Sequence, residues 1–134
     1  MPAMAKMRIL VVDRESAIRG LARFSLDVVG GWEVLVAGSA TEGVAKARAE
    51  LPDVILLDAA MPDMDSLSVL QELLADEATR HIPVILLMEG VGPEGRENFA
   101  VPGVVGLISK DFYLVDLPDK IGEILGSHSR FSTS

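Results

Sequence analysis

The chain contains no cysteine, which excludes disulfide bonds, thiolate metal sites and a cysteine nucleophile. Aromatic residues make up only 4% of it, so valine, leucine, isoleucine and alanine must build the core. No apolar run approaches the roughly 20 residues that span a bilayer, and residues 1–6 lack the apolar segment of a signal peptide. We therefore expect a cytoplasmic protein without a membrane partner.

Positive charge is also scarce, because 12 lysines and arginines face 20 acidic residues and leave a net charge of −8. Direct binding to nucleic acid needs a basic face, so we expect no nucleic-acid partner. The 49% of hydrophobic residues excludes a disordered chain, and the 134 residues suit one domain. We expect a disordered leader at residues 1–6, a folded domain at 7–126 and a disordered tail at 127–134.

Apolar runs alternate with helical periodicity along the chain. Strands are predicted at residues 7–12, 32–37, 54–57, 84–88 and 104–109. Helices are predicted at residues 16–29, from Ser39 or Thr41 to 51, at 66–78, at 94–101 and after Asp116. This alternation predicts an α/β fold with a parallel sheet covered by helices on both faces.

Helical spacing also predicts which side chains face the core. For the first helix these are Ile18, Leu21, Ala22, Ser25 and Val29. For the third they are Leu67, Leu70, Leu73 and Leu74. The helix at 94–101 has only about two turns between glycines and prolines, which makes it marginal without packing.

Charged residues follow the predicted strands at their carboxyl ends. Asp58 follows the third strand directly, and the other residues at strand ends are Asp13, Arg14, Glu15, Met88, Glu89 and Lys110. The carboxyl ends of parallel strands meet at one edge, where ligands collect in such sheets. Clustered carboxylates repel, so Arg14 and Lys110 are the expected counter-charges. The simpler alternative is that Asp58 only caps the turn shaped by Pro62.

Several stretches resemble the receiver domain of response regulators, the flavodoxin-like module of two-component signalling. They are Ile9–Asp13, Asp53–Asp58, Met61–Asp65, Ile82–Ile85, and Gly103–Gly106 leading to Lys110. The resemblance runs from Met7 to about Leu125. It implies a flavodoxin-like (βα)5 fold, in which a doubly wound five-stranded parallel sheet lies between two helix layers. It also implies a signalling domain whose only chemistry is self-catalysed phosphoryl transfer, and not an enzyme.

The same resemblance implies roles for individual residues. Asp58 matches the acceptor of a phosphoryl group from a sensor histidine kinase or phosphotransfer protein, and Lys110 matches the cation beside it. Asp13, Asp58 and the backbone carbonyl of Ala60 match the family's ligands for Mg²⁺. The family's helix 4, strand 5 and helix 5 form its usual face for a downstream protein.

The sequence departs from the family around this site. Arg14 stands where the family has a second acid, which should weaken Mg²⁺ binding; Glu15 could substitute, or could serve as an acid at a helix start. Met88 replaces the switch hydroxyl and Leu107 the switch aromatic, so Leu107 is expected in the core. Glu89 replaces a small residue and adds negative charge.

The peptide bond after Lys110 is a further departure, because Asp111 stands where the family has a proline in a cis peptide. A cis bond before a non-proline residue costs about 2.5–4 kcal/mol. We therefore expect either a trans bond with Lys110 displaced or a strained cis bond.

Two functional hypotheses follow from these matches and departures. The first is a phosphorylatable receiver with Asp58 as acceptor and weakened dependence on Mg²⁺. The second is a pseudo-receiver, a protein-interaction module that works without phosphorylation, in which Arg14 pairs with Asp58, Asp13 or Glu89.

Overall fold

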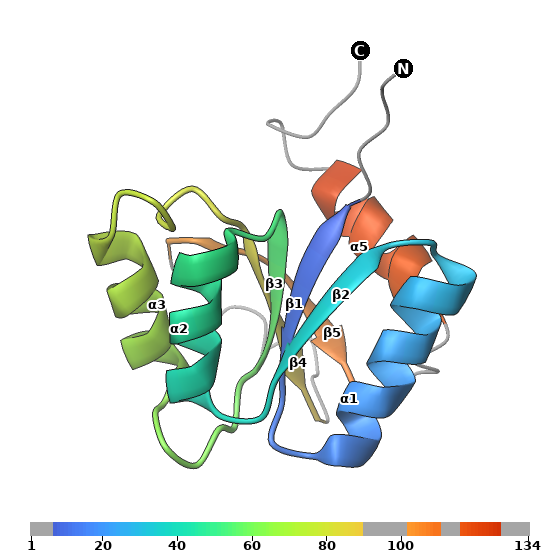
Figure 1. The fold of residues 1–134 in the computed structure, drawn as a ribbon, viewed down its shortest axis with the longest axis horizontal. Helices are drawn as coiled ribbons and strands as arrows, with labels where there is room; N and C mark the ends of the chain where they lie inside the picture. Colours follow the sequence, from blue (N-terminus) through green and yellow to red (C-terminus); the bar gives the residue numbers. More distant parts are fainter. Residues whose placement is uncertain (1–6, 90–101, 111–115, 127–134) are drawn as a thin grey trace.

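The computed structural model describes residues 7–89, 102–110 and 116–126 (Figure 1). The predicted leader and tail, the helix predicted at 94–101 and the peptide bond between Lys110 and Asp111 lie outside these residues. None of the helices described in the structure is long and apolar enough to cross a membrane.

The sheet contains the five predicted strands, all parallel. They are β1 (Arg8–Val12), β2 (Glu33–Ala37), β3 (Val54–Asp58), β4 (Val84–Met88) and β5 (Val104–Ser109). Their order in the sheet is β2-β1-β3-β4-β5. Strand order therefore reverses between β1 and β3, which makes their carboxyl ends the expected place for a ligand in a doubly wound sheet. The flavodoxin-like fold is confirmed.

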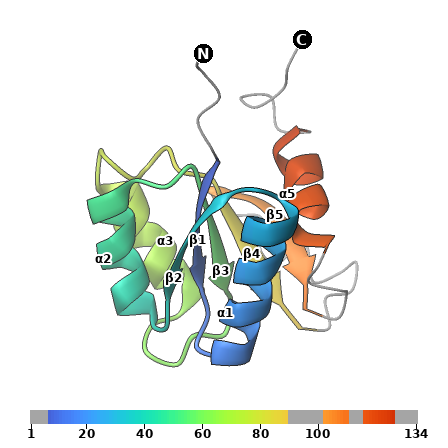
Figure 2. The ribbon, with the colours of Figure 1, turned by 45° about the vertical axis from the view of Figure 1, so that its right-hand side comes forward.

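Helices cover both faces of the sheet. They are α1 (Ser16–Arg23), the π-helix η1 (Phe24–Val29), α2 (Ala40–Glu50), α3 (Ser66–Ala75) and α5 (Leu117–Gly126). Figures 1 and 2 show α2 and α3 on one face of the sheet and α1 with α5 on the other. Alternate strand residues feed two separate cores: Leu10 and Ile55 pack toward α2 and α3, and Ile9 and Leu56 toward α1 and α5.

The first helix differs from its prediction in its second half. It is α-helical only to Arg23 and continues as a π-helix to Val29. The wider π turn changes the helical period, so Leu26 is buried in place of Val29, and Ser25 is buried as predicted. Leu21 and Val29 were predicted to face the core, and both predictions are wrong, because these side chains are 50% and 59% exposed.

The third helix ends earlier than predicted, at Ala75 instead of residue 78. The hydroxyl of Thr79 donates to the carbonyl of Leu73 at 2.7 Å. This bond gives a carbonyl in the last turn of the helix a hydrogen-bond partner without a further helical turn. Val69, Leu70 and Leu73 form the buried stripe. Leu67 and Leu74 lie outside this stripe and are exposed, so their predicted burial is wrong.

The loop after β3 is tied to the start of α2. The carboxylate of Asp63 accepts hydrogen bonds from the backbone N–H groups of Ala40 and Thr41, both at 3.0 Å. These bonds favour the charged carboxylate, and they hold the pKa of Asp63 below its ordinary value. In the same loop Met61 is buried in the core. Both contacts fix the course of the chain just beyond Asp58.

Candidate functional site

Asp58 is the last residue of β3 and is only 2% exposed. Every residue of β3 is buried, so the carboxylate at the end of this strand also lies below the protein surface, at the carboxyl edge of the sheet. The backbone N–H of Ala60 donates to Oδ1 of Asp58 at 3.0 Å, and that of Ala59 donates to the carbonyl of Leu87. Asp58 therefore does cap the turn that follows it, as the simpler interpretation of this residue proposed. The cap uses only Oδ1 of the carboxylate.

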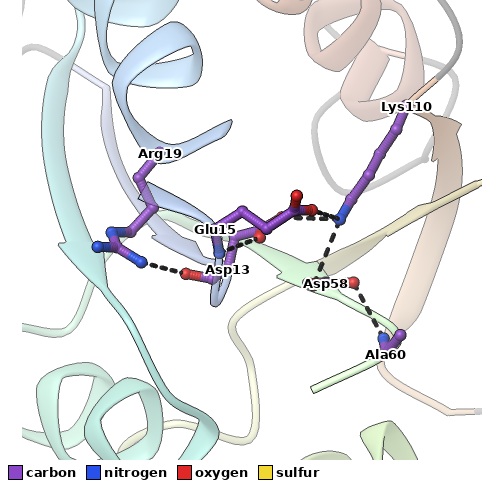
Figure 3. A network of polar contacts seen from close by, with 6 residues as sticks. All are labelled: Asp13, Glu15, Arg19, Asp58, Ala60 and Lys110. Atoms are coloured by element: carbon purple, nitrogen blue, oxygen red, sulfur yellow. Dashed lines mark hydrogen bonds and ion pairs between the residues drawn. The ribbon is translucent and has the colours of Figure 1, made fainter. Parts of the chain in front are cut away.

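Asp13 lies directly after β1 and is completely buried. Its Oδ1 accepts the backbone N–H of Glu15 at 2.9 Å. The guanidinium of Arg19 donates to the backbone carbonyl of Asp13 at 2.7 Å (Figure 3). Arg19 was not predicted as a site residue, and hydrophobic periodicity gives no signal for it, because its contact is to a backbone atom.

Lys110 extends from the end of β5 into this cluster of acids (Figure 3). Its Nζ lies 3.0 Å from Asp13 Oδ2, 3.3 Å from Asp58 Oδ2 and 3.6 Å from Glu15 Oε1. The side chain is only 8% exposed. The structure thus brings Asp13, Asp58 and Lys110 together as predicted, and Lys110 reaches Asp58.

Burial and charge act in opposite directions on these groups. Burial raises the pKa of Asp13 above its ordinary value, and the contacts with Glu15 and Lys110 only partly offset this. Burial alone would lower the pKa of Lys110, but the contact with Asp13 and the charges of Asp13 and Asp58 outweigh it and raise that pKa. The acids beside Lys110 therefore favour its cationic form, whereas burial disfavours the charged form of Asp13.

We expect the free energy of unfolding of Asp13→Asn, relative to that of the wild type, to increase as pH rises. An acid whose pKa is higher in the folded state loses stability as pH rises from its unfolded pKa through its folded pKa. The variant lacks this loss, so its stability relative to the wild type should be lowest near pH 3 and should grow as pH rises. Urea denaturation of both proteins across this range measures the difference, and a relative stability that falls with rising pH would contradict the assignment.

A cavity of about 280 Å³ opens at this edge of the sheet. It is lined by Arg14, Glu15, Asp58, Ala59, Ala60, Met88, Glu89 and Lys110. All of these except Ala59 were predicted from the sequence as site residues. Three of the residues that depart from the family pattern, Arg14, Met88 and Glu89, therefore line the same pocket as Asp58 and Lys110.

Glu15 and Arg14 behave differently from each other in this pocket. Glu15 occupies the N-cap position of α1 but makes no side-chain cap; its carboxylate lies 3.6 Å from Lys110 instead. Glu15 therefore stands at the start of α1, where the helix dipole favours an acid, and its carboxylate also lies near Lys110 in the pocket. Arg14 is exposed and forms no ion pair with another residue of the described chain, so the predicted pairing with Asp58, Asp13 or Glu89 is absent there.

The two altered switch positions, Met88 and Leu107, carry apolar side chains that pack against the core. Met88 ends β4, lines the cavity and packs against the core on the α2 and α3 face. Leu107 is partly buried against the same core, as predicted for a residue that replaces the family's aromatic. Glu89 is exposed at the cavity rim. Neither switch position offers a hydroxyl to a ligand bound at Asp58.

The 2-1-3-4-5 parallel sheet, the buried acid at the end of β3 and the lysine after β5 define a doubly wound α/β domain with a charged site at its switch point. The model of the response regulator receiver domain matches residues 9–122. The chain belongs to the response regulator receiver family and is a receiver domain of two-component signalling.

Individual relatives agree with this assignment. The probable transcriptional regulatory protein TcrX of Mycobacterium tuberculosis is 30% identical over 87% of this chain and 49% of its own length. Response regulator PleD of Caulobacter vibrioides is 44% identical over 69% of this chain and 21% of its own. The structure of the chemotaxis response regulator CheY4 of Vibrio cholerae superimposes with a TM-score of 0.82 at 26% identity, covering 90% of this chain and all of that one. The chain spans about half or less of these two curated relatives.

Proposed function

We propose that Asp58 is the phosphoryl acceptor of this receiver domain. Receiver domains interact with histidine kinases or phosphotransfer proteins and with downstream effectors, and they are signalling domains, not enzymes in the usual sense. In the proposed step an oxygen of Asp58 attacks phosphorus, and the bond from phosphorus to the donor's imidazole nitrogen breaks. The products are an acyl phosphate at Asp58 and a free histidine, which takes up a proton.

The observation that carries this proposal is the placement of Asp58 Oδ2. Oδ1 is held by the N–H of Ala60, while Oδ2 lies beside Lys110 at 3.3 Å in a pocket open to solvent. A nucleophile needs a free oxygen and a nearby cation for the charge that develops on the phosphoryl group. Both are present at Oδ2.

A pseudo-receiver that acts without phosphorylation is the second candidate. The observation that favours it is the charge network, in which Lys110 contacts the carboxylates of Asp13, Glu15 and Asp58. In this alternative the network is structural, and the domain signals only through partners. For either candidate we propose that β5 and α5 contribute to the surface for a downstream protein; the fourth helix of that predicted face lies outside the described residues.

Incubation with acetyl phosphate separates the two candidates. The receiver proposal predicts one added phosphoryl group per chain in the intact mass, which hydroxylamine removes because it cleaves acyl phosphates. A chain that gains no mass with or without Mg²⁺, after circular dichroism has shown it to be folded, would favour the pseudo-receiver.

A further inference from the structure

Receiver domains generally bind Mg²⁺ at the phosphorylation site, but the donor set of this chain fits that ion poorly. Mg²⁺ requires nearly octahedral oxygen ligation. Oδ1 of Asp13 and Oδ1 of Asp58 accept backbone N–H groups, and Oδ2 of each faces the ammonium of Lys110 at 3.0 and 3.3 Å. Oδ2 of Asp13 accepts no hydrogen bond from the described residues. No three acidic or histidine side chains among the described residues are arranged to hold a metal. The position that supplies a second acid in the family carries Arg14.

Acidic side chains outnumber basic ones around the pocket. Its lining includes the cations Arg14 and Lys110 and three carboxylates, and Lys110 also contacts the buried Asp13 beside them. A phosphoryl group brings further negative charge to Asp58. Lys110 alone would then have to balance the negative charge of both its three carboxylate partners and the phosphoryl oxygens.

Arg14 is placed to supply the missing charge. It follows Asp13 directly, lines the same cavity as Asp58 and is exposed, with no ion pair to other residues of the described chain. The planar fork of its guanidinium matches two oxygens of a phosphoryl group. An arginine that contacts a transferring phosphoryl group stabilises the charge of the transition state.

We infer that Arg14 replaces the divalent cation in this receiver domain, so that Asp58 is phosphorylated without metal. This inference rests on the proposed function. In the step, Arg14 donates N–H bonds to two phosphoryl oxygens while Lys110 contacts the third. An oxygen of Asp58 forms the new bond to phosphorus, and the bond from phosphorus to the leaving acetate of acetyl phosphate breaks.

Phosphorylation rates in EDTA and in Mg²⁺ test the inference directly. The wild type should be phosphorylated in EDTA at a rate within about threefold of that in Mg²⁺. Arg14→Ala should be slowed about tenfold or more in EDTA, because mutations of such arginines remove large transition-state stabilisation. Arg14→Lys should recover part of the loss, since it keeps the charge without the planar fork. The rates come from time courses of intact mass with acetyl phosphate.

Arg14→Asp provides the complementary test. It restores an acid at the family's position, so it should bind Mg²⁺ about tenfold or more tightly than the wild type in calorimetric titration, and should be phosphorylated only with Mg²⁺. Arg23→Ala is the matched control, because it removes a charge from an exposed site on α1 outside the cavity. Thermal unfolding by circular dichroism verifies that each variant is folded.

The outcomes separate the two proposals. A wild type that requires Mg²⁺, or an Arg14→Ala variant with unchanged rate in EDTA, overturns the role of Arg14 while leaving Asp58 as acceptor. A folded wild type and Arg14→Asp that both remain unphosphorylated in either condition overturn the acceptor role, and the inference fails with it.

Discussion

Lys110→Met is expected to lower the free energy of unfolding by about 3 kcal/mol at neutral pH, the scale seen when one partner of a buried ion pair is removed. Lys110 is nearly buried and lies within 3.6 Å of Asp13, Asp58 and Glu15. Without it, two buried carboxylates lose their counter-charge and repel each other. Urea denaturation of wild type and variant at equal ionic strength measures the loss.

The matched control is Lys46→Met, which removes a lysine that is 39% exposed and pairs with Glu42 at the surface. Surface pairs contribute about 1 kcal/mol or less. The pKa of Lys110 is raised, so its contribution is fully present below pH 10.5 and fades as pH rises through its folded value. The difference between wild type and Lys110→Met should therefore shrink in strongly alkaline buffer. Equal losses for the two lysine variants would contradict the buried network.

Asp58→Asn is expected to abolish phosphorylation completely while leaving the domain folded. The amide cannot form an acyl phosphate, yet its carbonyl can still accept the N–H of Ala60. Lys110 keeps Asp13 and Glu15 as partners in the variant. Intact mass after acetyl phosphate should therefore show no added phosphoryl group, and circular dichroism should show a wild-type spectrum.

The control for this variant is Asp119→Asn, an exposed acid in the first turn of α5. It should accept one phosphoryl group at the wild-type rate. Full phosphorylation of Asp58→Asn would show that another acid in the chain is the acceptor. An unfolded Asp58→Asn would show instead that the carboxylate is needed for stability.

The strands and the site edge could be predicted from the sequence because their signals are local. Short apolar runs such as Val54–Leu57 end at a charged residue, and parallel pairing then brings Asp13, Asp58 and Lys110 to one edge. The side-chain geometry could not be predicted in the same way. The side chain of Glu15 lies near Lys110, and Arg19 donates to a backbone carbonyl. Both contacts depend on tertiary distances that the spacing of residues in the sequence does not encode.

The helix faces were predicted less well than the strands, for physical reasons. An ideal 3.6-residue period placed Val29 in the core, but the π-helix η1 changes the period after Arg23. Several leucines of α3 satisfy the helical spacing, and only packing decides that Leu70 and Leu73 are buried while Leu67 is not. Sequence patterns thus predicted the helices and strands, whereas tertiary contacts determine which of their residues are buried.

Mapping the phosphoryl group within the wild-type chain tests the central claim most directly. After treatment with acetyl phosphate, borohydride reduces an acyl phosphate of aspartate to homoserine, and peptide mass analysis locates the altered residue. The account predicts homoserine at position 58 and unchanged aspartates elsewhere, including Asp13. Homoserine at another position, or a fully unmodified chain under conditions that phosphorylate a control receiver domain, would contradict it.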